Sequence, residues 1–263
     1  MKKSTEGVTM KFVTKEIKNH IAYITISRPP VNALNRQTYT ELTDAFNSIY
    51  DDLEEVYVVI LTGEGKQFIA GNDLNEFSGT KKSDMNEQSG YFGNCLTNIY
   101  NCPVPVIGAI NGAAVGAGFC IAAVCDVLVA AEGARFGLTE MKVGVLGGLA
   151  FLPLMVPQKL GKYMTLTGSL VPAEKLENYG SVHSVVPKEQ LMEEAEKVAE
   201  EIMACPPLAL QAWKKSYKYI DRLDFMNIEH ITDLFILDLM DTEDSKEAAD
   251  AFMEKRKPVY RGR

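Results

Sequence analysis

Two short turns built from small residues are spaced to place backbone N–H groups around one oxygen atom. The first, residues 111–118 (Asn-Gly-Ala-Ala-Val-Gly-Ala-Gly), lies between the strand-like run 104–110 and the apolar stretch 119–124. A helix that begins after such a turn leaves its first N–H groups without intrahelical partners, where they favour negative charge. The second turn, residues 68–73 (Phe-Ile-Ala-Gly-Asn-Asp), follows a buried strand predicted at 56–62. Two such turns predict an oxyanion hole for a carbonyl-bearing ligand. An alternative explanation of the small residues in the Gly-rich turn is close packing of a helix on a strand, without any bound ligand.

The predicted elements around these turns alternate between strand and helix. Strands are predicted at 21–27, 56–62, 104–110 and 127–130, and helices at 36–53 and 191–204. The polar segment 79–90 predicts a mobile loop before a helix near 91–100. After Pro206-Pro207 the chain reads as almost wholly helical, with one helix from Asp244 to about Lys255.

Six motifs occur in family order from about residue 12 to the C-terminus, and through them the chain resembles the crotonase (enoyl-CoA hydratase/isomerase) superfamily. They are residues 29–35 (Pro-Pro-Val-Asn-Ala-Leu-Asn), 68–73, 105–118, 125–126 (Cys-Asp), 134–140 (Ala-Arg-Phe-Gly-Leu-Thr-Glu) and 251–258 (Ala-Phe-Met-Glu-Lys-Arg-Lys-Pro). The resemblance implies an α/β fold, the crotonase-type spiral of ββα units, with a C-terminal helical trimerisation region. Residues 1–205 are then the crotonase core with the acyl-CoA site, and residues 206–263 the C-terminal helical oligomerisation region, which assembles trimers that often pair into hexamers.

The resemblance also implies where an acyl-CoA substrate binds. Its thioester oxygen lies between the backbone N–H groups of Asn72 and Ala117, each worth about 3 to 4 kcal/mol toward an enolate-like transition state. Ala117 stands where Gly is usual, so its methyl group must point away from the ligand. The family holds the adenine by backbone groups around Ala70 and the phosphates by basic side chains. The substrate- and CoA-binding positions carried over are Arg28, Ala70, Gly71, Asp73, Leu74, Gly116, Gly148 and Lys255.

The acid and base residues distinguish this chain within the family. Hydratases of the family normally carry two glutamates; the first position is Cys120 here, and the second is kept as Glu140. Water addition needs two proton-handling groups, whereas moving a double bond needs a single base that takes and returns a proton. Glu140 is therefore predicted as the catalytic base, and isomerisation is favoured over hydration. Dehydration, decarboxylation and thioester hydrolysis stay open as other reactions of the family. Cys120 reads either as a nucleophile or, more simply, as a small core residue.

The segment after Glu140 departs from the family pattern. Gly147 replaces the usual Pro, and Ala150-Phe151 replaces the final Gly pair, which leaves an apolar wall with Leu146 and Leu149. Such a wall accepts hydrocarbon chains but discriminates poorly between lengths, because one methylene is worth only about 1 to 3 kcal/mol. The acyl group is therefore not predicted.

Composition excludes several other classes of protein. A net charge of −8 and a pI of about 5.1 argue against a nucleic-acid surface, which makes an RNA-binding or scaffold role the weakest alternative. Five cysteines without a Cys-x-x-Cys pair suggest neither disulfides nor zinc. With no long apolar run and no signal segment after Met1-Lys-Lys, we expect a cytoplasmic protein without membrane contact, metal, or cofactor beyond the CoA of its substrate.

Overall fold

A computed structural model describes residues 10–77, 85–221 and 242–259. Six strands form the large sheet in the spatial order β1-β2-β3-β4-β6-β9, with β1 and β2 antiparallel and all other neighbours parallel. These strands are β1 (Val13–Lys18), β2 (Ile21–Ile26), β3 (Val58–Gly63), β4 (Val106–Ile110), β6 (Val127–Ala131) and β9 (Ser184–Val186). A second, smaller sheet contains β5 (Ala114–Val115), β7 (Arg135–Gly137) and β8 (Val171–Pro172), in the order β5-β7-β8.

Helices connect and cover these strands. They are α1 (Arg36–Asn47), α2 (Leu74–Phe77), α3 (Met85–Tyr100), α4 (Ala117–Ala123), α5 (Leu152–Met155), α6 (Gln158–Thr167), α7 (Ala173–Glu177), α8 (Leu191–Met203), α9 (Pro207–Asp221) and α11 (Glu243–Met253). Short 3-10 helices are η1 (Ser48–Tyr50), η3 (Glu140–Val143), η4 (Leu149–Phe151) and η5 (Lys188–Gln190). In the described part of the chain, no helix is both long and apolar enough to cross a membrane.

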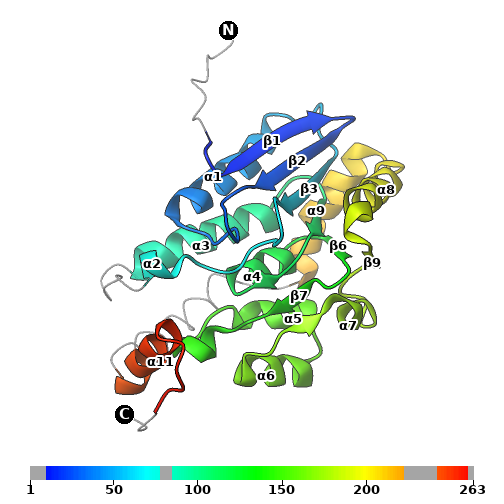
Figure 1. Cartoon of the computed structure of the whole chain (residues 1–263). Helices are drawn as coiled ribbons and strands as arrows, with labels where there is room; N and C mark the ends of the chain where they lie inside the picture. The colour runs from blue at the N-terminus through cyan, green and yellow to red at the C-terminus, as the bar shows by residue number, and fades with distance from the viewer. Residues whose placement is uncertain (1–9, 78–84, 222–241, 260–263) are drawn as a thin grey trace.

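Alternation along the strands builds a core on each face of the large sheet. Ile24 and Leu61 belong to the cluster that also contains the buried residues of α1, α3 and α4, whereas Val58 and Ile60 pack with α8. Figure 1 shows α1 and α3 on one side of this sheet and α8 on the other. Because successive side chains of a strand point to opposite faces, apolar residues at every position bury both sides.

Most predicted elements are confirmed, but some boundaries are wrong. The helix predicted at 36–53 ends at Asn47 as α1, and η1 follows it to Tyr50. The strands predicted at 21–27, 56–62, 104–110 and 127–130 correspond to β2, β3, β4 and β6, and the helix at 191–204 corresponds to α8. The loop predicted at 79–90 is wrong from Met85 onward, because α3 begins there and packs against α1. Packing between α1 and α3 outweighs the polar composition that predicted a loop. Residues 79–84 lie outside the described residues.

Part of the C-terminal region folds back on the core. Helix α11 begins at Glu243, one residue before the predicted start, and packs against η3, at the opposite end of the molecule from β1 (Figure 1). The Ser245 hydroxyl donates to the carbonyl oxygen of Gly144 over 3.0 Å. A side chain at Gly144 would lie 2.8 Å from the Cα atom of Ser245, so the absence of one there permits this close approach. The helix therefore supports the segment that carries Glu140.

Candidate active site

The two small-residue turns lie side by side. Ile69 and Ala114 form an isolated parallel bridge, in which the Ile69 N–H donates to Ala113 over 3.1 Å and the Val115 N–H donates to Ile69 over 2.9 Å. A Cβ atom at Gly118 would lie only 2.3 Å from the Ile69 carbonyl oxygen. Close packing between the turns therefore explains one glycine of the Gly-rich segment. It leaves Gly116 to be explained separately.

The backbone around Asn72 is fixed from one side. The carbonyl of Gly71 accepts from the Leu34 N–H over 2.8 Å, and the Asp73 N–H donates back to Leu34 over 2.8 Å. Since C=O and N–H point in opposite directions across a trans peptide, the bond at Gly71 directs the Asn72 N–H away from Leu34. Among the backbone hydrogen bonds of the described residues, this N–H donates to no carbonyl. Gly71 has a φ of 97°, a conformation that favours glycine.

The same argument applies at the start of α4. Gly116, with a φ of 57°, accepts from the Cys120 N–H over 3.2 Å, so its carbonyl points into the helix. The Ala117 N–H, on the other side of that peptide, points out of the helix start. Within the described chain this N–H also donates to no backbone carbonyl. Ala117 is 4% exposed and belongs to the main core cluster, so its methyl group packs inward.

Glu140 lies against the Gly-rich turn. A Cβ atom at Gly116 would lie 2.9 Å from Glu140 Oε1, and 3.5 Å from the Cα atom of Gly71 in the second turn. A Cβ atom at Gly147 would lie 3.3 Å from Glu140 Cγ. Two glycines therefore contact the Glu140 side chain, and a side chain on Gly116 would collide with its carboxyl group. An ionisable group thus lies beside the residue that precedes Ala117, where the two turns meet.

The environment of Glu140 favours its neutral form more than water does. Oε2 is buried and has no hydrogen-bond partner among the described residues. Burial raises the pKa of Glu140 from 4.5 to about 7, although the backbone N–H groups of Glu140 and Thr139 act in the opposite direction. A carboxyl group with a pKa near neutral pH can both remove and return a proton.

Cys120, the predicted replacement for the family's other glutamate, lies against Gly148 in the same segment. It is 1% exposed, and a Cβ atom at Gly148 would lie 2.7 Å from its sulfur. The predicted burial of this residue in the core is confirmed. No group of three or more His, Cys, Asp or Glu side chains that could hold a metal occurs among the described residues.

Tyr39 is a polar residue of this region that the sequence did not single out. Its hydroxyl donates to the side-chain oxygen Oδ1 of Asn72, and its side chain is 6% exposed. Burial raises the pKa of Tyr39 well above its usual value, and the nearby Cys95, Cys120 and Glu140 act in the same direction. Tyr39 precedes Leu42 by three residues, so the helical spacing alone predicts that Tyr39 is a buried core residue.

Known proteins resemble this chain over most of its length. The sequence profile of the family described as Enoyl-CoA hydratase/isomerase matches residues 16–263. The chain belongs to this family. An (E)-benzylidenesuccinyl-CoA hydratase from Thauera aromatica is 38% identical, over 95% of this chain and 99% of the relative. A carnitinyl-CoA dehydratase from Salmonella enteritidis PT4 is 35% identical, over 92% of this chain and 95% of the relative.

Solved structures show the same fold. A carnitinyl-CoA hydratase from Mycobacterium avium aligns with a TM-score of 0.82 at 31% identity, covering 95% of this chain and 98% of that one. An enoyl-CoA hydratase/isomerase from Pseudoalteromonas atlantica T6c aligns with a TM-score of 0.84 at 28% identity, covering 95% of this chain and 100% of that one. The chain is thus an enzyme of the enoyl-CoA hydratase/isomerase family with the crotonase fold, as its motifs predicted.

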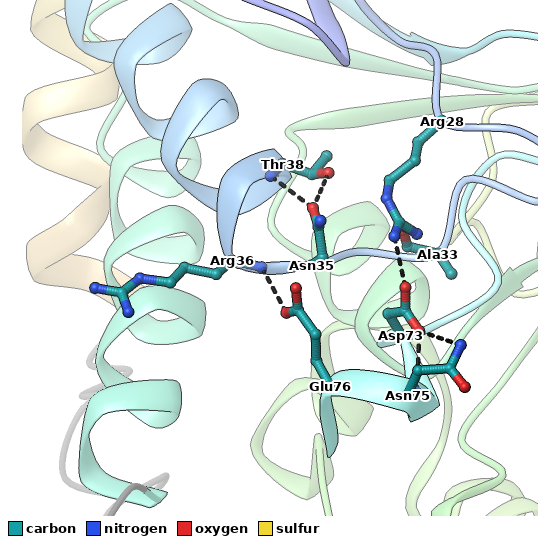
Figure 2. Close-up of polar contacts among 8 residues, drawn as sticks. All are labelled: Arg28, Ala33, Asn35, Arg36, Thr38, Asp73, Asn75 and Glu76. Carbon is teal, nitrogen blue, oxygen red and sulfur yellow. Dashed lines mark hydrogen bonds and ion pairs between the residues drawn. The ribbon is translucent and has the colours of Figure 1, made fainter. Parts of the chain in front are cut away.

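In this family member, Arg28 binds the turn formed by residues 68–73 rather than projecting freely into solvent. Its guanidinium donates to the Ala33 carbonyl over 2.7 Å and to Asp73 Oδ2 over 2.5 Å (Figure 2). Burial alone would raise the pKa of Asp73, but the bonds from Arg28 and Asn75 lower it below its usual value. Asp73 directly follows Asn72, so this ion pair restrains the turn. A contact between Arg28 and a CoA phosphate stays a prediction.

The short helix α2 ties the turn to α1 as well. The backbone N–H of Arg36 donates to Glu76 Oε2 over 3.0 Å, and the Asn35 side chain caps α1 by accepting from the N–H of Thr38 over 3.0 Å (Figure 2). A carboxylate at a helix N-terminus also interacts favourably with the helix dipole. The segment that follows Asn72 is therefore joined to the start of α1 by a hydrogen bond.

The other residues predicted to contact CoA differ in burial and in their partners. Ala70 is half-buried, and its N–H donates to Val31 over 3.2 Å. Leu74 begins α2, and its side chain lies outside the described residues. Lys255 is exposed just after α11 with a φ of 55°, whereas its neighbour Arg256 pairs with Glu247 and Glu254. Binding of a CoA phosphate by Lys255 stays a prediction.

Proposed function

We propose that this enzyme processes an acyl-CoA by stabilising the enolate of its thioester. The Asn72 and Ala117 N–H groups hold the thioester oxygen, and Glu140 transfers the proton. The observation that carries the proposal is the position of Gly116, which precedes one donor: a Cβ atom there would lie 2.9 Å from Glu140 Oε1 and 3.5 Å from the Cα atom of Gly71, which precedes the other donor. Donors fixed before the reaction stabilise developing charge without reorganising, which is worth about 3 to 4 kcal/mol each.

We favour double-bond isomerisation as the reaction. Glu140 takes a proton from C2 of a 3-enoyl-CoA, the electron pair is delocalised onto the thioester oxygen and C4, and the same carboxyl group returns the proton at C4. The product is the 2-enoyl-CoA, with no atom gained or lost. One base with a pKa of about 7 suffices for both transfers. Cys120 offers a buried thiol instead of a second carboxylate.

Hydration or dehydration is the second candidate, because the two relatives compared above are named a hydratase and a dehydratase. In that reaction Glu140 handles the proton at one carbon while water adds at, or leaves from, the next. A product-resolved assay separates the candidates. Purified protein is given 2-enoyl-CoA and 3-enoyl-CoA of several lengths, and 3-hydroxyacyl-CoA is measured beside the isomeric enoyl-CoA. We expect the isomer to dominate, and a predominance of hydroxyacyl product would select the second candidate.

The acyl pocket has an apolar side in this proposal. Leu146 and Leu149 are half-buried, whereas Phe151 is fully buried and packs edge to face against Phe92 at 6.2 Å. Phe151 therefore supports the wall from inside the core, and the two leucines are the candidates to contact a hydrocarbon acyl chain. Calorimetry with butyryl-CoA is expected to show about one site per chain, and no binding at millimolar ligand would overturn the proposed function.

We also propose a homotrimer or, since the family often pairs its trimers, a hexamer. Helix α9 supports this proposal because it carries exposed apolar side chains, with Leu208 77% exposed and Trp213 stacked on Tyr217 at 4.8 Å. The same C-terminal region contains further apolar residues that lie outside the described part of the chain: Ile228, Ile231, Leu234, Phe235 and Leu239. Light scattering that reports a monomer at micromolar concentration would contradict it.

A further inference from the structure

The hydrogen bond between Tyr39 and Asn72 links a buried side chain to an exposed turn. Tyr39 lies on α1 and is 6% exposed, whereas Asn72 is exposed. The Tyr39 hydroxyl donates to the Oδ1 atom of Asn72. The two residues are separated by 33 positions in the chain. A buried phenol needs a partner for its hydroxyl, and here that partner is the side chain of a predicted oxyanion residue.

The ring of Tyr39 is held firmly. It packs edge to face against Phe92 with ring centroids 6.2 Å apart, and Phe92 packs in the same way against Phe151. The backbone of Tyr39 is helical, with its N–H donating to Asn35 over 3.0 Å. Edge-to-face contacts of this kind stabilise one orientation of the ring. The hydroxyl is therefore delivered to Asn72 from a rigid position.

The turn at Asn72 needs such a restraint. Leu34 binds the carbonyl of Gly71 and the N–H of Asp73, and Arg28 pairs with Asp73. These contacts restrain the neighbours of Asn72 and not its side chain. Misplacement of a catalytic group by about 1 Å can lower a rate about 100-fold. We propose that Tyr39 is a positioning residue, which fixes the Asn72 side chain so that the Asn72 backbone N–H stays aimed at the thioester oxygen. This inference rests on the proposed function.

Tyr39 does not transfer the proton itself in this arrangement. A phenol has one proton, and that of Tyr39 is already donated to Asn72. Burial, followed by the nearby Cys95, Cys120 and Glu140, raises the Tyr39 pKa well above its usual value, so the hydroxyl stays protonated throughout the working pH range. Glu140 remains the only group assigned to proton transfer.

The direct test measures how strongly the hole polarises a bound carbonyl. Butyryl-CoA labelled with carbon-13 at the thioester carbonyl has no double bond to move, so isotope-edited infrared difference spectra report the bound carbonyl stretch without turnover. Tyr39→Phe keeps the ring and removes the hydroxyl. We expect the stretch to move to higher frequency than in wild type, because a misaimed donor polarises the carbonyl less, while the Kd changes less than about threefold.

Tyr50→Phe is the matched control. Tyr50 lies in η1, just beyond the other end of α1, and its hydroxyl donates to the Asn101 carbonyl over 3.0 Å, away from the site. Its removal deletes one tyrosine hydrogen bond, from a side chain that is 52% exposed, and leaves the carbonyl stretch at the wild-type frequency. A shift in Tyr50→Phe as large as in Tyr39→Phe would overturn the inference, because a general loosening of the fold would then explain both.

A double-mutant cycle identifies the route of the effect. Asn72→Ala keeps the backbone N–H but removes the acceptor for Tyr39. With an active enoyl-CoA we expect either single variant to lower kcat about tenfold with little change in KM, and the double variant to be no slower than Asn72→Ala alone. Additive losses would overturn the inference. Should Tyr39→Phe not fold, Asn72→Ala decides the matter alone: a carbonyl stretch equal to wild type overturns the inference.

Binding of butyryl-CoA tests the proposed function, and the carbonyl frequency tests the role of Tyr39. Absence of butyryl-CoA binding by the wild-type protein would overturn the proposed function and this inference with it. Binding by both proteins, with the same carbonyl frequency in wild type and Tyr39→Phe, would overturn the role of Tyr39 and leave the proposed function standing.

Discussion

Replacing Glu140 by Gln is expected to stabilise the protein while removing its activity. The carboxyl group is isosteric with the amide, so the packing against Gly116 and Gly147 is retained. In the folded protein burial raises the pKa of Glu140 from 4.5 to about 7. The folded state therefore binds the proton more tightly than the unfolded state. The contribution of neutral Glu140 to stability is complete below about pH 4.5 and is lost as the pH rises through about 7.

The size of the effect follows from that pKa difference. Each pKa unit corresponds to 1.36 kcal/mol, so ionised Glu140 destabilises the fold by up to about 3 kcal/mol at pH 8. This value is an upper bound, because the side chain is only half-buried and water screens part of the penalty. The Gln variant carries no such charge. We expect its free energy of unfolding to exceed that of wild type by about 1 to 3 kcal/mol at pH 8 and to match it near pH 4.5.

Urea denaturation followed by circular dichroism between pH 5 and pH 8, at one protein concentration, measures this difference. Glu132→Gln is the control, since Glu132 is exposed and lies outside the site. The same Glu140→Gln protein should retain acyl-CoA affinity and lose about 10² to 10⁴ in turnover. A pH-independent difference in stability, or a variant less stable than wild type at pH 8, would refute the argument from burial. Full activity would refute the assignment of the base.

Two further predictions concern buried polar groups. Cys120→Ala is expected to keep turnover within about threefold, and an inactive Cys120→Ala would instead favour a thiol-dependent mechanism. Cys120→Glu should raise hydration relative to isomerisation in the product-resolved assay, at some loss of stability because Gly148 lies against that side chain. Lys214→Met should lower the free energy of unfolding by about 3 to 5 kcal/mol, because Lys214 is 4% exposed and pairs with Asp126 over 2.7 Å. The exposed neighbour Lys215→Met should lower it by less than about 0.5 kcal/mol in the same urea titration, and equal losses in the two variants would contradict the ion-pair argument.

The features predicted best from sequence were those with local causes. Small residues between apolar runs predicted both turns, and the structure explains Gly118 by contact with Ile69 and Gly116 by contact with Glu140. Strand positions followed from runs of apolar residues long enough to be buried on both faces. The start of α3 was missed because a polar segment with Gly90 reads as a loop, whereas packing against α1 keeps it helical.

Features that depend on distant contacts could not be predicted. Tyr39 has the helical spacing of a core residue, and nothing in its neighbourhood indicates a hydrogen bond to Asn72. Arg28 was expected at the CoA phosphates, yet its bond to Asp73 joins residues 45 positions apart. The support of η3 by α11 joins Gly144 and Ser245, which are 101 positions apart. Such pairings require the tertiary structure, because local patterns carry no information about them.

The central claim, that Glu140 is the base and titrates near neutral pH, is tested most directly by the pH dependence of kcat/KM. With an enoyl-CoA that the wild-type enzyme converts, kcat/KM should rise about tenfold between pH 6 and pH 8, with an apparent pKa of about 7, because only ionised Glu140 accepts the proton. The residual rate of Glu140→Gln should lack this rise. A wild-type rate that falls over this range, or the same rise in the Gln variant, would contradict the account.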